Sequence, residues 1–505
     1  MKITFFASGK ESIKELLDQK GASLYAPCAG RGTCGQCIVI VTSGDCPPSE
    51  RDKAMLSSDN IAGGKRLACQ AYPIGEVTVE IHDVTAPVIL SDFELEGNET
   101  FMSSGSINIG IDLGTTTVVM AMPGPDGHPS VTRSFLNPLV RFGADVVSRL
   151  EAAADGKLAE MHDLLRERLE DELQTLLRDV RKDDDRPISI ALAGNTVMTH
   201  IFMGWDTSGL GEYPFKPYSL SVSQTELQGI PVTVFPGISA FVGGDIVAGI
   251  YGLDLINAGA GSMLMDLGTN GEIVLKTENG LIASSASAGP ALEGAHLSCG
   301  TGCVEGAVTG ITLENLRPIL TVAGSKIPGN KGLAGACGSA VLELVDELLR
   351  TGIIKPDGSF IESYADEGFA FGTDRSGRVL ALTQADVREI QLAKGAVSTA
   401  ALMLCEKGGL DPQALRISLA GGMGTGLRPD RIKRTGIIPS CASVTAVGNS
   451  VLKGLMRFLG ESINSETKST AVKALSELAG SVTVLDLALG EGFQERFLTS
   501  LNFIL

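Results

Sequence analysis

No stretch of the sequence approaches the 18–20 uninterrupted apolar residues that a membrane-spanning helix needs. The first residues, MKITFFASGKESIKELL, also lack the long apolar core and the small-residue cleavage site of an export signal. Basic residues number 41 against 59 acidic ones, and the formal net charge of −18 argues against nucleic acids and anionic membranes as partners. We therefore expect a cytoplasmic protein whose partners are small molecules and other proteins.

Aromatic residues are scarce, at 5% of the chain, whereas glycine occurs 62 times. Together with a hydrophobic content of 44%, this composition is typical of a compact, turn-rich α/β protein and not of a disordered or fibrous one. A chain of 505 residues also exceeds what one hydrophobic core usually supports, which predicts two to four domains.

Cysteine is concentrated at one end of the chain, where five of the ten cysteines fall in the first seventy residues. Residues 25–37, YAPCAGRGTCGQC, contain three of them in the spacing C-x5-C-x2-C, and a further one follows after 31 residues. In a long chain without an export signal, such clustering indicates metal or redox chemistry before disulfide bonds. Gly30, Gly32 and Gly35 allow the loop backbone to approach a bound group closely and to adopt positive φ angles.

The loop has one residue more than the plant-type C-x4-C-x2-C spacing of [2Fe–2S] ferredoxins and resembles the ferredoxins with a five-residue gap. The resemblance implies a [2Fe–2S] cluster with the ligands Cys28, Cys34, Cys37 and Cys69. A zinc site is one alternative, although zinc pairs usually come from two short C-x2-C units and only one is present. A plain thiol loop is the other alternative. Cys46, in a GDCPP turn, lies outside the spacing.

The segments around the cysteine loop show strand and helix patterns. KITFFAS, QCIVIVTSG and EVTVEIHDV are typical of strands, and ESIKELLDQKG is typical of a helix that ends at glycine. Together with the cysteine spacing, this order resembles the β-grasp [2Fe–2S] ferredoxin domain, which we assign to residues 1–82. Residues 83–105 lose the periodicity and end in a Ser/Gly tract, which predicts a linker.

The tetrapeptide DLGT occurs twice, at residues 112–115 and 266–269, each time between two apolar strand patterns. Two copies in matching contexts predict a duplicated domain with a ligand between its halves. Glycine lets backbone N–H groups reach an anion, and threonine hydroxyls add further donors. An aspartate beside a phosphate is unfavourable unless a cation intervenes, so Asp112 and Asp266 imply Mg²⁺ held largely through water.

The residues predicted to bind the nucleotide come from three turns. They are Gly114, Thr115, Thr116 and Thr117 of the first DLGT turn, Gly268, Thr269 and Asn270 of the second, and Gly421 and Gly422 of the later turn RISLAGGMGTG. Asp245, in FVGGDIVAG, is the remaining catalytic candidate, either as a base toward a hydroxyl substrate or as the group that positions an attacking water. A capping role at a helix N-terminus is the alternative for this residue.

The segments IDLGTTT, MDLGTNG and LAGGMG follow the order of the two phosphate motifs and the adenosine motif of the ASKHA superfamily, which residues 106–505 resemble. The resemblance implies a two-lobed, actin-like and ribonuclease H-like ATPase domain that binds ATP and Mg²⁺. With the ferredoxin domain and the linker, the expected fold class is a multidomain α+β and α/β protein. A small-molecule kinase that senses redox state through its ferredoxin domain is one interpretation of this fusion.

Longer tracts, including NPLVRFGADVVSRL, SASAGPALEGAHLSCG and GACGSAVLELVDELLRTGII, resemble the reductive activators of corrinoid-dependent proteins. The resemblance implies ATP-dependent transfer of one electron from the cluster to cob(II)alamin, restoring cob(I)alamin in a corrinoid protein of a methyltransferase system such as an O-demethylase. It also implies an unidentified electron donor and a homodimer. Activation of another low-potential enzyme is the alternative. In one departure from the longer members, the linker leads directly to the ATPase domain, without a separate middle domain.

Three further features have structural interpretations. His200 lies in an apolar stretch and is expected to be a hydrogen-bonded core residue. His296, Cys299 and Cys303, in GAHLSCGTGC, are not expected to bind a metal. The leucine spacing and dense charge of residues 150–182 predict a surface helix or helix pair.

Overall fold

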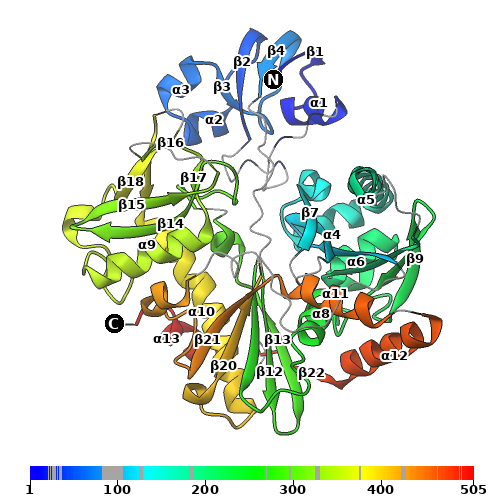
Figure 1. Cartoon of the computed structure of the whole chain (residues 1–505). Helices are drawn as coiled ribbons and strands as arrows, with labels where there is room; N and C mark the ends of the chain where they lie inside the picture. Colours follow the sequence, from blue (N-terminus) through cyan, green and yellow to red (C-terminus); the bar gives the residue numbers. More distant parts are fainter. Residues whose placement is uncertain are drawn as a thin grey trace. The chain divides into compact units, whose positions relative to one another are not determined.

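The structure is a computed structural model of the whole chain (Figure 1). It describes residues 1–20, 22, 24, 30, 32, 37–81, 106–123, 129–180, 186–268, 270–294, 297–324, 330–374, 377–421, 428–462, 464–487, 490 and 492–504. The chain forms two compact units, Met1–Ala86 with Leu136–Leu165 and Pro87–Phe135 with Arg166–Leu505. The predicted linker 83–105 lies outside the described residues.

The N-terminal part of the first unit is a four-stranded sheet with the strand order β1-β4-β2-β3. Helix α1 begins at a capping box, in which the Glu15 carboxylate accepts the Ser12 N–H (2.7 Å) and the Ser12 hydroxyl accepts the Glu15 N–H (3.2 Å). Alternate residues of β4, Val77 and Val79, are fully buried in the core. The elements are β1 (Lys2–Ser8), α1 (Ile13–Gln19), β2 (Ile38–Asp45), α2 (Glu50–Met55), α3 (Ser58–Ala62), β3 (Lys65–Leu67) and β4 (Ile74–Glu80).

A helical segment begins in the first unit and continues into the second. It comprises α4 (Val146–Ala152), a short π-helical turn (Ala153–Lys157) and α5 (Leu158–Val180). Side chains at spacings of four, four, four and three residues along α5 are fully buried: Met161, Leu165, Leu169, Leu173 and Leu176. The surface helix or helix pair predicted for residues 150–182 is therefore confirmed over the described residues 150–180, with one apolar stripe along α5.

The second unit contains two six-stranded sheets. The first has the order β7-β6-β5-β8-β10-β9, and the second has the order β21-β20-β11-β12-β13-β22. The first is built from β5 (Ile107–Leu113), β6 (Thr117–Pro123), β7 (Pro129–Leu136), β8 (Ile188–Gly194), β9 (Ser223–Leu227) and β10 (Ile230–Val234). The second is built from β11 (Ser262–Leu267), β12 (Gly271–Thr277), β13 (Gly280–Ala286), β20 (Arg416–Ala420), β21 (Ser443–Gly448) and β22 (Val482–Val484), labelled in part in Figure 1.

The two sheets repeat one arrangement. Each DLGT strand, β5 or β11, pairs antiparallel with the next strand of its hairpin and parallel with a strand from later in the chain. The order β7-β6-β5-β8-β10 in one sheet thus corresponds to β13-β12-β11-β20-β21 in the other. The duplication that the repeated tetrapeptide predicted is confirmed by this shared topology.

Helices and two smaller sheets complete the second unit. The helices are α6 (Thr196–Met203), α7 (Ser208–Gly211), α8 (Gly244–Gly252), α9 (Gly338–Arg350), α10 (Gln384–Lys407), α11 (Ser450–Glu461), α12 (Ser465–Ser481) and α13 (Phe493–Ser500). The smaller sheets contain β14 (Ala307–Glu314), β15 (Arg317–Val322) and β17 (Gly335–Ala336), and β16 (Lys331–Leu333), β18 (Phe369–Asp374) and β19 (Val379–Leu382). Within the described ranges, no helix combines the length and apolar character needed to cross a membrane.

Helices α8 and α11 approach each other through glycines. A Cβ atom placed on Gly454 of α11 would lie 1.9 Å from the carbonyl oxygen of Ala248, and one on Gly252 of α8 would lie 2.5 Å from the Gly454 nitrogen. Because both obstacles are backbone atoms, a side chain at Gly454 requires the helices to separate. These two helices follow β10 and β21, the corresponding strands of the two sheets, so their contact joins the repeats.

We expect Gly454→Ala to destabilise the protein by about 1–3 kcal/mol because it overpacks this crossing. The matched control is Gly480→Ala in α12, where a Cβ atom meets nothing within 4 Å. That exchange should stabilise the helix by about 0.5–1 kcal/mol, since alanine is the better helix former. Thermal unfolding midpoints measure both effects, and a Gly454→Ala midpoint equal to that of the unmodified protein would contradict the close packing.

Candidate functional site

Two of the four predicted cluster ligands lie within the described residues, and they are adjacent. Cys37 immediately precedes β2 and Cys69 follows β3, and the carbonyl of Cys37 accepts the N–H of Ala68 (2.8 Å). Both cysteines are buried, and their Sγ atoms lie 3.3 Å apart. Cys28 and Cys34 lie outside the described residues. The antiparallel pairing of β2 with β3 therefore brings together two sulfur ligands that are distant in sequence.

Glycines of the cysteine loop adopt backbone conformations that other residues rarely tolerate. Gly30 has φ +86° and Gly32 has φ +70°. The side-chain amide of Gln70 donates to the Gly30 carbonyl (2.7 Å), and a Cβ atom on Gly32 would lie 2.8 Å from the Gln70 side chain. These two glycines therefore lie close to Cys69 and its neighbour Gln70, as a buried cluster requires. The described residues fit a [2Fe–2S] group.

Cys46 is a buried thiol of the same domain that differs from these ligands. Burial raises its pKa to about 11; the charge of Arg66 opposes this shift, and the charges of Asp52 and Asp45 add to it. The thiol is therefore neutral at physiological pH, which agrees with its position outside the ligand spacing.

The first DLGT turn connects β5 to β6 and contacts both repeats. A Cβ atom on Gly114 would lie 2.4 Å from the carbonyl oxygen of Thr117, so the turn is too tight for a side chain there. The Thr115 hydroxyl accepts from the Asn195 amide (2.9 Å), and the Thr116 hydroxyl donates to Glu293 (3.4 Å). The threonines expected to bind phosphate are thus positioned by side chains from elsewhere in the chain.

The second DLGT turn connects β11 to β12 and is one residue shorter. Leu267 pairs with Gly271 across it, whereas Leu113 pairs with Val118 in the first turn. The Gly268 N–H donates to the Asn270 carbonyl (2.9 Å), which closes the turn. Thr269 lies outside the described residues.

Gly421, the first glycine of the predicted adenosine motif, lies directly against the second DLGT turn. It has φ +92°, and a Cβ atom there would lie 2.6 Å from Oδ1 of Asp266 and 2.4 Å from the carbonyl oxygen of Leu267. Only glycine fits this conformation and this space. Gly422 lies outside the described residues.

Three aspartates predicted from separate motifs influence one another electrostatically. Burial raises the pKa of Asp112 to about 7; the hydrogen bond from the Asn449 amide (2.7 Å) opposes this and the charge of Asp245 adds to it. Burial also raises the pKa of Asp245 to about 6, against the hydrogen bond from the Ile246 N–H (2.8 Å). Asp245 lies in the first turn of α8, where Gly243 is the N-cap residue.

Asp266 carries the most perturbed carboxyl among these aspartates. Burial raises its pKa to about 8, and the charges of Asp245, Asp112 and Glu293 add to the shift. Such mutual repulsion is relieved by a proton or a cation, and hard cations prefer carboxylate oxygens. In the part of the chain that the structure describes, no three His, Cys, Asp or Glu side chains are already arranged to hold a metal ion directly.

Four residues of this region do not feature in the sequence prediction. Glu272 lies directly opposite Asp266 in the β11–β12 ladder, where like charges are destabilising, and its pKa is raised by burial and by Asp245 and Asp266. Glu293 reaches the Thr116 hydroxyl. Asn195 caps α6 and Asn449 caps α11, and each also donates to the first DLGT motif. The signal available in the sequence was a Gly-Asn pair that follows a strand, in AGNT and VGNS.

His200 is a structural residue, as predicted. Its ring is fully buried, Nδ1 donates to the Thr196 carbonyl (2.7 Å) and Nε2 accepts the Tyr218 N–H (3.1 Å). Burial lowers its pKa, so the ring is neutral. Cys299 and Cys303 have pKa values raised by burial, which also keeps these thiols neutral. His296 lies outside the described residues.

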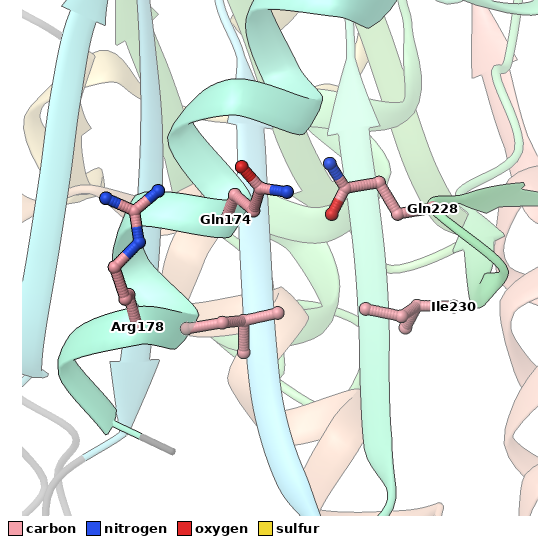
Figure 2. Close-up of a pocket in the computed structure, with 5 residues that line it drawn as sticks. Gln174, Arg178, Gln228 and Ile230 are labelled. Carbon is pink, nitrogen blue, oxygen red and sulfur yellow. The ribbon is translucent and has the colours of Figure 1, made fainter. Parts of the chain in front are cut away.

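A cavity of about 610 Å³ lies elsewhere, between the end of α5 and the β9–β10 hairpin. Figure 2 shows Gln174 and Arg178 of α5 facing Gln228 and Ile230 of the hairpin. None of the described residues of the DLGT turns lines this cavity, so it is separate from the described part of the predicted nucleotide site.

Comparison with protein families assigns most of the chain. Residues 2–73 match the 2Fe-2S iron-sulfur cluster binding domain, residues 107–258 match the RACo middle region, and residues 260–504 match the C-terminal domain of RACo, the ASKHA domain. The expectation that the middle domain is missing was therefore wrong, because the first repeat is that middle region. The matches support a [2Fe–2S] cluster and ATP as cofactors and confirm the predicted fold class.

Individual proteins show the same relationship. The corrinoid activation enzyme RamQ of Eubacterium limosum is 28% identical over 78% of this chain and 70% of its own length. The [Co(II) methylated amine-specific corrinoid protein] reductase of Methanosarcina barkeri is 24% identical over 64% of each chain. A solved reductive activator for corrinoid, iron-sulfur protein matches in fold with a TM-score of 0.67 and 23% identity, over 99% of this chain and 96% of that one. On its sequence and its fold, the chain belongs to the RACo family.

Proposed function

We propose that this protein is an ATP-dependent reductive activator, which transfers one electron to the cob(II)alamin of a corrinoid protein and restores cob(I)alamin for methyl transfer. The observation that carries the proposal is the fusion of a [2Fe–2S] domain with the RACo middle and ASKHA regions in one chain. Two relatives that span most of the chain are named for corrinoid activation and for Co(II) reduction.

The proposed cluster ligands are Cys28, Cys34, Cys37 and Cys69. The 3.3 Å separation of the Cys37 and Cys69 sulfurs supports this set. These four thiolates would hold the cluster, which would supply the single electron needed to reduce the substrate Co(II) to Co(I). Each 59 mV by which the corrinoid potential lies below that of the cluster costs about tenfold in equilibrium, which explains the need for ATP.

The proposed nucleotide site lies between the two DLGT turns. Asp112 and Asp266 would hold Mg²⁺ largely through water, and the cation would remove the repulsion that raises their pKa values. Backbone N–H groups and hydroxyls of Gly114–Thr117 and Gly268–Asn270 would bind the phosphates, and Gly421 and Gly422 would lie against the adenosine. Asp245 would position the attacking water.

The acceptor we propose is the corrinoid subunit of a methyltransferase system such as an O-demethylase. The protein would act in the cytoplasm as a homodimer and would receive electrons from a separate donor. The cysteine-rich N-terminal domain supports a reducing compartment, where thiols remain available to iron.

The test combines the protein, a chemical reductant and a cob(II)alamin-loaded corrinoid protein, and follows the cobalt by visible absorbance. Cob(I)alamin should accumulate with Mg·ATP and not with Mg·ADP. Phosphorylation of an added metabolite without any cob(I)alamin would instead favour the kinase interpretation. ATP-dependent reduction of a different low-potential enzyme, with the corrinoid protein unaffected, would favour the other alternative.

A further inference from the structure

We infer that helix α9 positions the adenosine motif through two acidic residues, Glu343 and Asp346, which bind arginines on the segment that leaves the motif. This inference rests on the proposed ATP site. The motif LAGGMG spans residues 419–424, and residues 428–435 follow it after three intervening residues. Neither acidic residue belongs to a DLGT turn, so each acts on the nucleotide only through another segment.

Glu343 is fully buried and binds Arg428 with both carboxylate oxygens. The Arg428 Nε atom donates to one oxygen (2.7 Å) and a terminal guanidinium nitrogen donates to the other (2.6 Å). The second oxygen also accepts the N–H of Ile311 in β14 (3.0 Å). A bidentate pair fixes direction as well as distance, so Arg428 is held in one orientation.

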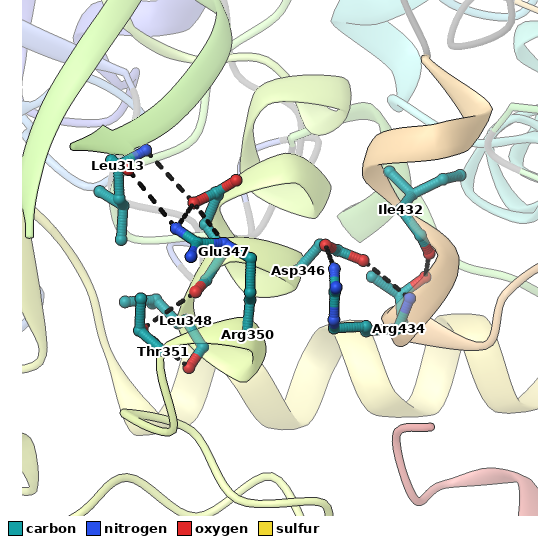
Figure 3. Close-up of polar contacts among 9 residues, drawn as sticks. Leu313, Asp346, Glu347, Leu348, Arg350, Thr351, Ile432 and Arg434 are labelled. Atoms are coloured by element: carbon teal, nitrogen blue, oxygen red, sulfur yellow. Dashed lines mark hydrogen bonds and ion pairs between the residues drawn. The ribbon is translucent and has the colours of Figure 1, made fainter. Parts of the chain in front are cut away.

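Asp346 holds the same segment six residues further along. One carboxylate oxygen accepts the backbone N–H of Arg434 (2.7 Å) and the other accepts its guanidinium (2.7 Å), as Figure 3 shows. The Asp346 side chain is only 4% exposed. Residues three apart lie on one face of a helix, so the same face of α9 binds both ends of residues 428–434.

Helix α9 is itself fixed on β14, which makes it a suitable platform. Glu347 accepts the Leu313 N–H (3.3 Å) and pairs with Arg350 (2.6 Å), also in Figure 3. A Cβ atom on Gly310 of β14 would lie 2.6 Å from the Arg428 guanidinium and 3.1 Å from Glu343, so glycine leaves room for the ion pair.

The N-terminus of α9 contacts the phosphate side of the site. A Cβ atom on Gly338 would lie 1.6 Å from the Leu292 carbonyl oxygen and 3.1 Å from the nitrogen of Glu293. Glu293 in turn binds Thr116 and raises the pKa of Asp266. The helix therefore connects the segment after the adenosine motif with a residue of the phosphate site, while Gly421 lies against the second DLGT turn at the other end of the motif.

A buried ion pair is weak evidence for stability, because desolvation offsets most of the attraction. Its rigid geometry is better explained by the need to hold Arg428, the first described residue after the motif, in one position. We therefore expect these pairs to control nucleotide affinity more than folding.

The experiment measures binding of Mg·ATP and of Mg·tripolyphosphate to the full chain, together with kcat and KM for ATP. In Glu343→Gln, the Kd and KM for ATP should rise about tenfold. The Kd for tripolyphosphate and the kcat at saturating ATP should stay within about twofold of the unmodified values, since neither requires the adenosine contacts. Glu389→Gln, at an exposed position of α10, is the control for the loss of one carboxylate and should change none of these by more than about twofold.

The double variant Glu343→Met/Arg428→Met keeps the test decisive if Glu343→Gln does not fold, because apolar replacement of a buried pair preserves stability. It should show the same selective loss of ATP affinity. Equal weakening of ATP and tripolyphosphate, or unchanged ATP affinity, would overturn the inference. Failure of the unmodified protein to bind ATP at all would instead refute the proposed function.

Discussion

Replacing Asp266 by asparagine should stabilise the nucleotide-free protein while it weakens the ATP site. Burial and the charges of Asp245, Asp112 and Glu293 raise the pKa of this carboxyl to about 8 from an ordinary value of 3.8. The protonated form is therefore favoured in the folded state. Its contribution to the free energy of unfolding is complete below about pH 4 and is lost as the pH rises through about 8.

The neutral amide avoids this loss, so the rise in the thermal midpoint of Asp266→Asn should be larger at pH 8 than at pH 5. With Mg·ATP present, we expect the unmodified protein to have the higher thermal midpoint, because the variant lacks a charge that the cation requires. We expect ATP-dependent activity to fall roughly 10–100-fold, the range seen when the surroundings of a metal are altered.

Asp171→Asn, at an exposed position on α5, is the control for the loss of one carboxylate. It should change neither the midpoint nor the activity. Equal midpoints of Asp266→Asn and the unmodified protein at both pH values, together with unchanged ATP-dependent activity, would remove Asp266 from the site.

Replacing Cys37 by alanine should abolish the cluster and electron transfer but leave ATP binding intact. The iron content should fall from about two per chain to none, and the visible absorbance should disappear. ATP binding should persist, because the DLGT turns belong to sheets of the other compact unit. Iron analysis, the visible spectrum and Mg·ATP binding measure the three quantities.

Cys46→Ala is the matched control, since it removes a buried thiol of the same domain whose raised pKa keeps it neutral. This variant should retain its iron and colour. A Cys37→Ala protein that still binds two irons would show that the proposed ligand set is wrong.

Local sequence patterns correctly predicted the helices and strands whose formation depends on residues close together in the chain. Helix α1, the strands around the cysteine loop and the leucine stripe of α5 each depend on residues that are close together in the sequence. The repeated DLGT also placed Asp112 and Asp266 at equivalent strand ends, because two copies of one hairpin fold alike.

Site residues that tertiary packing brings in from distant parts of the chain could not be predicted from local sequence patterns. Glu293 and Asn449 reach the first DLGT motif from distant parts of the chain, and no periodicity marks either of them. The middle region was taken for one lobe of a single ATPase domain, because both regions carry a DLGT tetrapeptide between two strand patterns. The pairs of Glu343 and Asp346 with their arginines likewise depend on how α9 packs.

The central claim is that one chain couples an ATP site to the delivery of a single electron. It is tested most directly by a single turnover, in which protein reduced beforehand and freed of excess reductant meets a cob(II)alamin-loaded corrinoid protein. With Mg·ATP, we predict that cob(I)alamin forms in an amount equal to the clusters oxidised, and without nucleotide that almost none forms. Equal cob(I)alamin with and without Mg·ATP, or clusters that stay reduced in its presence, would contradict the account.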